Sequence, residues 1–240
     1  MCRLLGIVCN DPVDFKLMLR DAPKSLSFLS KEHPHGWGIA VFDPGSGWSI
    51  DKAPQRALDD QRFHAAALQS RGISLVAHVR QRTVGPLSFV NTHPFVRDGW
   101  VFCHNGTIAD IEFLRQNASP RRLGELGGET DSELLLAYLL SRLDEEADLH
   151  VPDERFSDCL IRASRVLRAR PGFGAFNYLL GNGRTLFAHR FGRTLYVLDR
   201  QCVLFVASEP MTEEPWQLIE EGSLLRFDRD PTPICRFLAA

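Results

Sequence analysis

The second residue of the chain can combine two reactive groups on one amino acid. The sequence opens MCRLLGIVCN, so removal of Met1 would make Cys2 the first residue. Cys2 would then carry a thiol with an ordinary pKa of about 8.5 and a free α-amine with a pKa of about 7.7–8.0. A nucleophile and a base would lie together, both near neutral pH. Position alone also fits an arbitrary second residue, so the rest of the chain has to decide.

Polar residues gather in five other short segments, at the ends of expected strands, in loops or at the start of an expected helix. These segments are HPHGWG (33–38), HVRQRTVG (78–85), NTHPF (91–95), HNG (104–106) and GETDSE (128–133). Functional side chains usually lie at such positions. Each segment also has a purely structural explanation, such as loop histidines for His33 and His35 or a helix N-cap for Asp131. Function is therefore inferred from the whole set.

Together with Cys2, these segments resemble the class II glutamine amidotransferases, which are N-terminal-nucleophile hydrolases. The resemblance rests on the cysteine after Met1, Arg-x-x-Thr in HVRQRTVG, HNG after an apolar strand, and ETDSE about two dozen residues later. Their order along the chain also agrees. HGWGIA and NTHPF are more similar to small stand-alone members, which include hydrolases of γ-glutamyl amides in ergothioneine synthesis and glutathione breakdown. The resemblance covers essentially the whole chain, with the motifs in residues 1–133.

The resemblance implies that Cys2, Asn105 and Gly106 are the catalytic residues. Cys2 Sγ would attack the side-chain amide of glutamine while its own α-amine accepts the thiol proton. Water would then release glutamate from a glutamyl thioester. The Asn105 side-chain amide and the Gly106 N–H would donate to the developing oxyanion, and loss of one such donor costs roughly 10²–10³ in turnover.

The resemblance also implies a set of substrate-binding residues around the amino-acid head. Arg80 would bind the α-carboxylate through charge-assisted hydrogen bonds, and Thr83 would add a hydroxyl. Asp131 would bind the α-ammonium group, and Gly128 and Glu129 would line the same pocket. Three further residues are expected to be structural: His93, His104 and the core residue Trp37.

Two questions about function stay open at this point. Gln81, Arg82 and Val84 differ from the residues usual in the large biosynthetic members, so the substrate is either glutamine or a larger γ-glutamyl compound. The alternative to an enzyme is a catalytically silent relative that binds a γ-glutamyl ligand or a partner protein. A silent relative is expected to lose the nucleophile or an oxyanion donor, and this chain has both. We expect no ammonia-using second domain, so ammonia would pass to a separate protein or to water.

Composition excludes several other classes of function. The chain has 240 residues, a net charge of −2, 44% hydrophobic and 24% charged residues, an ordinary globular balance. It has no basic block that predicts nucleic-acid binding and no apolar run of about 18–20 residues that predicts a membrane span. The six scattered cysteines include no CxxC pair, which disfavours a zinc site or a disulfide framework. We expect a cytoplasmic protein with no metal and no cofactor.

Hydrophobic patterning predicts strands, then helices, then strands. Helices are predicted at 12–30, 55–72, 131–146 and 157–170, and a connecting loop at 145–155. Strands are predicted at 3–9, 36–43, 47–53, 73–80, 100–106, 175–190, 194–199, 202–208 and 223–228. Asn-Gly at 182–183 predicts a hairpin with both turn residues at positive φ.

The fold class follows from the resemblance rather than from periodicity. It implies an α+β protein, a four-layer α/β/β/α sandwich of the N-terminal-nucleophile hydrolase type, with two mainly antiparallel sheets between helical layers. Residues 1–240 would form a single domain, with Met1 removed. Cys2 would lie on an edge of one sheet, with its amine exposed to the pocket.

Overall fold

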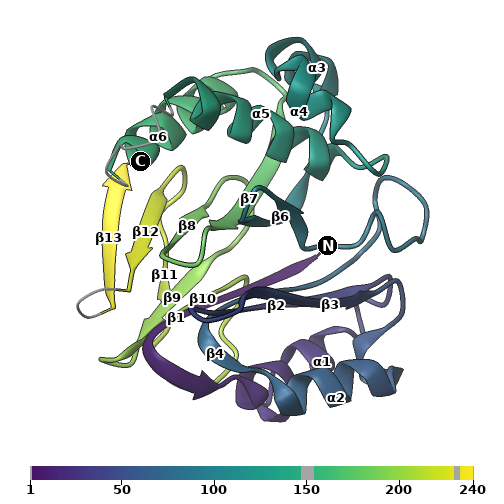
Figure 1. The fold of residues 1–240 in the computed structure, drawn as a ribbon, viewed down its shortest axis with the longest axis vertical. Helices are drawn as coiled ribbons and strands as arrows, with labels where there is room; N and C mark the ends of the chain where they lie inside the picture. The colour runs from purple at the N-terminus through teal and green to yellow at the C-terminus, as the bar shows by residue number, and fades with distance from the viewer. Residues whose placement is uncertain (1, 147–153, 230–232, 240) are drawn as a thin grey trace.

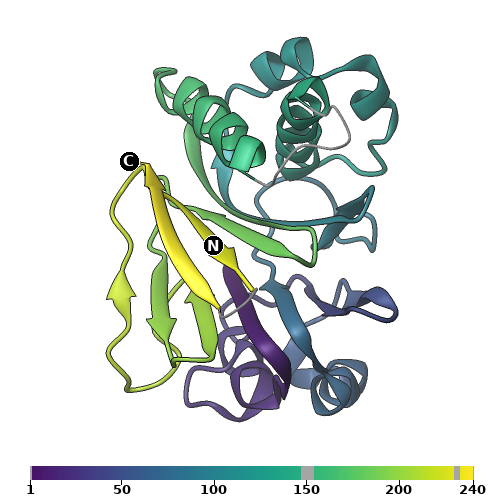
Figure 2. The ribbon, with the colours of Figure 1, turned by 60° about the vertical axis from the view of Figure 1, so that its left-hand side comes forward.

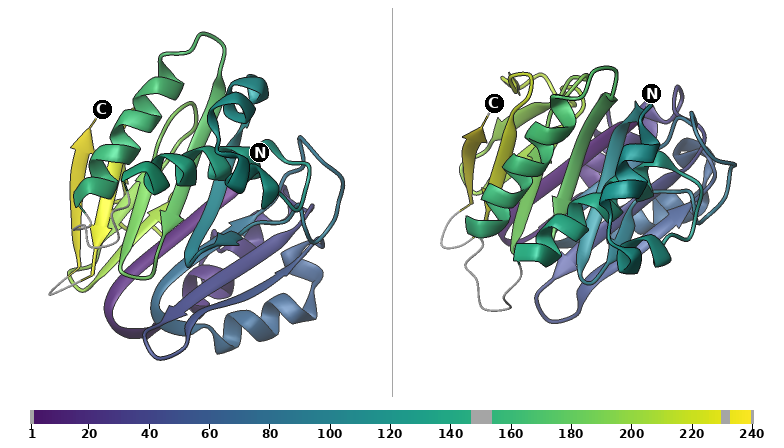
Figure 3. Two further views of the ribbon diagram at one scale, coloured as in Figure 1. Left: turned by 45° about the horizontal axis from the view of Figure 1, so that its top comes forward. Right: turned by 90° about the horizontal axis from the view of Figure 1, so that it is seen from above.

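Two antiparallel sheets lie face to face in the computed structural model, which describes residues 2–146, 154–229 and 233–239. Helices cover the outer face of each sheet, so the layers follow the order helix, sheet, sheet, helix (Figure 1, Figure 3). The expected α+β four-layer sandwich is therefore confirmed. Within the described ranges, no helix is long and apolar enough to cross a membrane.

Seven strands form sheet A, which contains the N-terminal strand near its centre. Their order is β11-β9-β10-β1-β4-β2-β3. They span Arg3–Asp14 (β1), Trp37–Asp43 (β2), Gly47–Ala53 (β3), Arg71–Val79 (β4), Tyr196–Asp199 (β9), Val203–Ala207 (β10) and Gln217–Leu218 (β11). Segments from both ends of the chain therefore build one sheet, because β1 pairs with β4 on one side and with β10 on the other.

Six strands form sheet B, in the order β13-β12-β8-β7-β6-β5. They span Phe95–Arg97 (β5), Trp100–Ile108 (β6), Gly174–Gly181 (β7), Thr185–His189 (β8), Leu224–Asp228 (β12) and Ile234–Ala239 (β13). The yellow C-terminal strands lie at one border of the sheet (Figure 2). The chain passes directly from β4 in sheet A to β5 in sheet B, so residues 80–94 connect the two sheets.

Short helical segments cover sheet A and longer helices cover sheet B. The segments on sheet A are a π-helical turn η1 (Leu17–Asp21), α1 (Leu26–Leu29), a 3-10 turn η2 (Ala57–Asp59) and α2 (Gln61–Gln69). The helices on sheet B are α3 (Ile111–Asn117), α4 (Pro120–Gly124), α5 (Asp131–Glu146) and α6 (Glu154–Arg168). Helix α5 has the predicted bounds, and α6 begins and ends two to three residues before its prediction.

Side chains alternate along β1 between two different apolar layers. Leu5 and Ile7 pack with the helices under sheet A, whereas Leu4 and Val8 belong to the core between the sheets. Because successive strand residues point to opposite faces, Cys2 shares the inter-sheet face with Leu4. The expectation that Cys2 lies on a sheet edge is wrong, since it directly precedes β1, a central strand. It lies where the inter-sheet layer ends.

The helix predicted at 12–30 is largely absent. Strand β1 continues through Pro12 to Asp14, and the rest forms two separate turns, η1 and α1. Pro23 explains the break, because a residue before proline avoids helical backbone and Ala22 is extended. Ser25 then starts α1 by accepting the Phe28 N–H.

Other predictions need smaller corrections. The helix predicted at 55–72 ends at Gln69, and Gly72 belongs to β4. Only Gly183 has positive φ in the β7–β8 hairpin, where Asn182 Oδ1 accepts backbone N–H groups instead. Trp37 is fully buried as expected, with its indole N–H donating to Asp60. The connection predicted at 145–155 lies mostly outside the described residues.

Gly6 allows the two sheets to approach each other closely. A Cβ at this position would lie 2.7 Å from Leu186 Cδ2 and 2.8 Å from Val206 Cγ1. We therefore expect Gly6→Val to lower the free energy of unfolding by about 1–3 kcal/mol through overpacking. Urea unfolding measures the change, and Gly124→Ala, where a Cβ meets open space, is the matched control. Equal stability of the two variants would contradict this account of the inter-sheet spacing.

Candidate active site

The Cys2 thiol lies against the backbone that follows β4. Its Sγ accepts the Gln81 N–H at 3.3 Å and lies 3.5 Å from the Gln81 carbonyl oxygen. The residue is 9% exposed. Because Gln81 comes directly after Arg80, the end of β4 positions the thiol and a cationic side chain together.

The segment HPHGWG fixes the backbone at this end of β4. Gly36 O accepts the Arg80 N–H at 2.8 Å, and the His35 N–H donates to Arg80 O at 2.9 Å. The Arg82 N–H then donates to His35 Nδ1 at 3.1 Å. His35 is therefore a backbone support rather than a metal ligand. Among the described residues, no three His, Cys, Asp or Glu side chains form a candidate metal site.

Arg80 is a buried cation whose guanidinium donates to backbone carbonyls. It is 3% exposed, and its guanidinium donates to Val84 O at 2.8 Å and Pro86 O at 3.2 Å. In the part of the chain that the structure describes, no carboxylate oxygen lies within 4.0 Å of it. A buried guanidinium ordinarily has an anionic partner.

Strand β6 carries Asn105 and Gly106 on the opposite sheet. A Cβ on Gly106 would lie 1.8 Å from Ala175 O, so only glycine fits where β6 pairs with β7. Asn105 is buried, and its side-chain amide has no hydrogen-bond partner among the described residues. Cys103, two positions earlier on the same face of β6, lies within electrostatic range of Cys2. Because Cys103 belongs to the core between the sheets, Asn105 lies on the inter-sheet face of β6, and Cys2 shares the facing side of β1 with Leu4.

Two side-chain contacts join the sheets beside these residues. His78 Nε2 on β4 lies 3.2 Å from the His104 carbonyl oxygen on β6. The Thr107 hydroxyl, next to Gly106, donates to Thr83 Oγ1 at 3.3 Å. Thr83 is thereby placed against the strand that carries the candidate oxyanion donors.

Asp131 begins α5 but does not cap it. Thr130 is the N-cap, since its hydroxyl accepts the Glu133 N–H at 3.3 Å. The Asp131 carboxylate accepts the Ile108 N–H at 2.8 Å, which joins the helix to the end of β6. It is 5% exposed, and within the described ranges no cationic nitrogen lies within 4.0 Å of it. Capping alone therefore does not explain this residue.

The two residues before the cap, Gly128 and Glu129, are held by side chains that the sequence analysis gave no role in the site. Glu133 accepts the N–H groups of Gly127 and Gly128 at 3.2 and 2.7 Å and pairs with Arg97. Asn91 Oδ1 accepts the Glu129 N–H at 2.9 Å. The available signals were the helix-start pattern for Glu133 and the NTHPF motif for Asn91.

Comparison with known proteins identifies the family. The model of "Glutamine amidotransferases class-II" matches residues 1–204. The chain belongs to the class-II glutamine amidotransferases. An uncharacterized protein of Methanocaldococcus jannaschii is 32% identical over 95% of this chain and 69% of its own length. A gamma-glutamyl-hercynylcysteine sulfoxide hydrolase of Mycobacterium tuberculosis is 29% identical over 89% of this chain and 87% of its own.

A solved structure shows that the fold is shared. The glutamine aminotransferase class-II domain protein of Silicibacter pomeroyi has a TM-score of 0.68 to this amidotransferase. The match covers 99% of this chain and 98% of that one at 19% identity. The sandwich of two antiparallel sheets is therefore common to both.

Burial and nearby charges shift the pKa of the Cys2 thiol in opposite directions in this amidotransferase. Burial raises the pKa of the Cys2 thiol above its ordinary value. The hydrogen bond from the Gln81 N–H and the charge of Arg80 lower this pKa in part, whereas the charge of Asp131 raises it. Arg80, directly after β4, and Asp131, the first residue of α5, therefore act on the thiol in opposite directions. The raised pKa keeps the thiol neutral at pH 7.

Four histidines near this end of the sandwich are buried and neutral. Burial lowers the pKa of His33 and of His78 to about 3 and lowers the pKa values of His93 and His104. The His93 ring packs 4.2 Å from His78 and 4.5 Å from Phe95, centroid to centroid. His104 Nδ1 lies 2.9 Å from the Ser132 hydroxyl on α5. These contacts fit the expected structural roles of His93 and His104.

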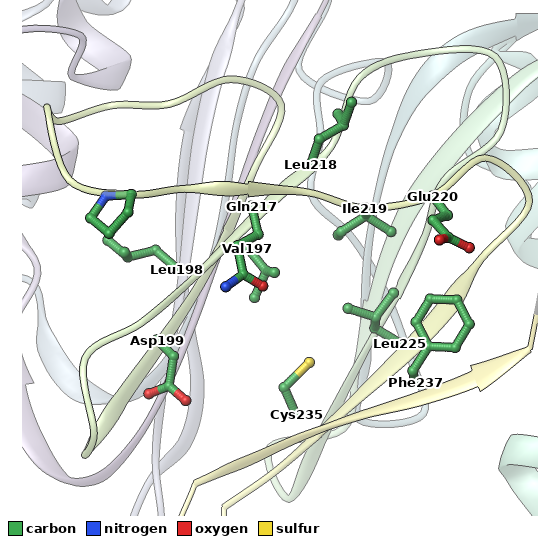
Figure 4. A pocket seen from close by; sticks show the side chains of 11 residues that line it. Val197, Leu198, Asp199, Gln217, Leu218, Ile219, Glu220, Leu225, Cys235 and Phe237 are labelled. Carbon is green, nitrogen blue, oxygen red and sulfur yellow. The ribbon is translucent and has the colours of Figure 1, made fainter.

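A cavity of about 580 Å³ lies elsewhere, between β9 and β11 of sheet A and β12 and β13 of sheet B. Most of its lining residues are apolar, among them Leu218, Ile219 and Phe237 (Figure 4). It contains none of the candidate site residues. The candidate active site is therefore the group of buried polar residues beside Cys2, and this cavity is not part of it.

The raised thiol pKa predicts how Cys2 reacts with a simple electrophile. Because only the thiolate is nucleophilic, alkylation by iodoacetamide should accelerate by about tenfold per pH unit from pH 7 to pH 9 without a plateau. Peptide mass spectrometry follows the adduct at Cys2, and Cys2→Ser in the same chain identifies signal from the other cysteines. A plateau at or below pH 8 would show that the site stabilises the thiolate.

Proposed function

We propose that this amidotransferase cleaves the side-chain amide of glutamine or of a γ-glutamyl compound through a thioester on Cys2, after removal of Met1. One observation carries the proposal. Arg80 and Asp131 are buried, opposite in charge and without ionic partners among the described residues, and both act electrostatically on the Cys2 thiol. A zwitterionic amino-acid head supplies the two missing charges.

Cys2 supplies the nucleophile and, once it is the first residue, the base. The α-amine accepts the thiol proton as Sγ attacks the amide carbon, and the same proton goes to the leaving nitrogen as the C–N bond breaks. Ammonia or an amine leaves, and the glutamyl group remains as a thioester. Water then adds to the thioester and the C–S bond breaks. Glutamate is released, and the Cys2 thiol is regenerated. The neutral thiol agrees with a mechanism that needs this base.

Asn105 and Gly106 are proposed to stabilise the oxyanion. The uncommitted amide of Asn105 provides one donor, and the Gly106 N–H provides the second. Donors fixed by a strand need little reorganisation when charge develops. The absence of a Cβ at Gly106 allows β7 to approach closely and fix this part of β6.

Arg80 is proposed to bind the α-carboxylate and Asp131 the α-ammonium group. Two of the five guanidinium donors are used by Val84 O and Pro86 O, which leaves others for a ligand. The N–H groups of 127–129 are all taken by Glu133 and Asn91. The backbone of this segment can therefore offer a ligand only carbonyl oxygens, which suit an ammonium group. The Thr83 hydroxyl would contact the same carboxylate.

Two further parts of the proposal concern the leaving group and the domain. The mycobacterial relative is named for a γ-glutamyl substrate, which supports including γ-glutamyl compounds beside glutamine. Ammonia or amine would pass to a separate protein or to water. Because the candidate residues come from both sheets and from α5, the described chain would act as one catalytic domain.

An electrophilic glutamine analogue tests the nucleophile. We expect purified protein to have lost Met1 and to gain one adduct of a diazoketone analogue of glutamine, mapped to Cys2. Cys2→Ala should retain the fold, bind glutamine and lose hydrolysis entirely, since it lacks the attacking sulfur. Intact mass, peptide mapping and ammonia release provide the readouts.

The control is Cys202→Ala, because Cys202 is an exposed cysteine outside the site. It should label and hydrolyse like the wild type. Hydrolysis at the wild-type level by Cys2→Ala would overturn the mechanism. A processed protein that binds glutamine without an adduct or turnover would instead support a catalytically silent relative.

Truncated substrates test the proposed binding of the α-carboxylate by Arg80. Arg80→Met should raise KM for glutamine about 10–100-fold, which corresponds to loss of one charge-assisted interaction of about 1.5–3 kcal/mol. 4-Aminobutanamide, which lacks the α-carboxylate, should show nearly the same kcat/KM with both proteins. A variant that lost activity on both compounds equally would show that Arg80 acts only through the loop carbonyls.

A further inference from the structure

The segment that connects the two sheets contains a buried asparagine that the mechanism above does not use. Asn91 is 1% exposed and follows the exposed residues Leu87, Phe89 and Val90. Two hydrogen bonds hold the residue that follows it. Its neighbour Thr92 donates its hydroxyl to Ser88 O, and the Lys52 ammonium donates to Thr92 O at 2.7 Å.

The Asn91 amide joins the two segments that carry the proposed head-group ligands. Its Nδ2 donates to Pro86 O at 3.2 Å, in the segment after Arg80. Its Oδ1 accepts the Glu129 N–H at 2.9 Å, in the segment before Asp131. The Asn91 side chain therefore connects the segment after Arg80 with the segment before Asp131.

Arg80 and Asn91 share a single acceptor. The guanidinium of Arg80 donates to the same Pro86 oxygen at 3.2 Å. A displacement of Asn91 would therefore move or release an atom that helps to hold the Arg80 guanidinium. On the other side, Glu129 is only two residues before Asp131, at the start of a rigid helix.

Two glycines form the slot in which the amide lies. A Cβ on Gly128 would lie 2.2 Å from Asn91 Oδ1, and a Cβ on Gly85 would lie 3.0 Å from Asn91 Nδ2. Gly85 also has φ of +71°, a conformation that glycine adopts readily. The slot admits an asparagine amide and is too tight for a longer side chain.

We propose that Asn91 is the positioning residue that sets the separation between the α-carboxylate site at Arg80 and the α-ammonium site at Asp131. This inference rests on the proposed function and deepens it. Asn91 gives the enzyme selectivity for substrates with a complete α-amino-acid head. It acts through Pro86 O and the Glu129 N–H and makes no contact with the scissile amide.

The contacts require both a donor and an acceptor at position 91. Asparagine supplies the two on one short side chain. An ionised aspartate keeps the acceptor for Glu129 but places a second acceptor against Pro86 O. A protonated aspartate restores the donor, and burial favours the protonated form. The aspartate variant therefore gives the proposal a pH signature.

The test measures selectivity for the head group rather than activity alone. Asn91→Ala should lower kcat/KM for glutamine by at least tenfold, mostly through KM. It should lower kcat/KM by less than threefold for 4-aminobutanamide and glutaramate, which lack the carboxylate and the amine respectively. Asn91→Asp should behave similarly at pH 8 and should recover relative to wild type as the pH falls. Asn117→Ala, which also removes an amide that donates to a backbone carbonyl, should leave all ratios unchanged.

Binding provides the readout that is independent of turnover. In the Cys2→Ala background, calorimetry should show that Asn91→Ala weakens glutamine binding at least tenfold. Hydrolysis of glutamine by wild type with unchanged selectivity in Asn91→Ala would overturn the inference and leave the proposed function intact. Glutamine binding that depends on Asn91, without turnover by processed wild type, would support the inference and overturn the proposed function. If glutamine neither binds nor reacts, both are wrong.

Discussion

The close approach of the two sheets at one end of the sandwich is the constraint on which the site depends. Over most of their area the facing sheets bury aliphatic side chains, but near Cys2 they bury polar ones instead. Buried polar groups are costly unless they are bonded, and here the contact between His78 Nε2 and His104 O provides one partner across the sheets. Because the chain crosses from β4 to β5 at this end, the crossing segment has to form one wall of the site.

Close backbone packing explains why the motifs HPHGWG and HNG contain glycine. Gly38 on β2 would place a Cβ 2.0 Å from His93 O, and Gly106 would place one 1.8 Å from Ala175 O. These contacts bring the crossing segment onto sheet A and β7 onto β6. Much of the site is consequently built from backbone groups, such as the Gln81 N–H at the thiol. Side chains such as Glu133 then take up the remaining N–H donors of the helix start.

The sequence predicted some of the elements closely and missed others, whereas the roles of the candidate site residues stay predictions. Strong periodicity gave α5 its bounds, and alternation gave most strands, because those patterns reflect direct burial. The failure at 12–30 arose because β1 continues through Pro12, which depends on pairing of Val13 and Asp14 with β4, a long-range contact. The central position of Cys2 depends on pairing with β10, some 200 residues away. Asn91 could not be assigned a role, because its partners are backbone atoms of two separate segments.

In the proposed function, selectivity for a ligand comes from two buried charges, those of Arg80 and Asp131. Arg80 has carbonyl dipoles around it and Asp131 has a backbone N–H, yet neither has an opposite full charge within ion-pair distance among the described residues. Breaking a buried ion pair is costly because it leaves such a charge alone. A ligand with a carboxylate and an ammonium group in one rigid head offsets the cost of burying Arg80 and the cost of burying Asp131 together. A ligand with only one of these groups offsets one of the two costs. The separation between Arg80 and Asp131 therefore matters as much as their presence.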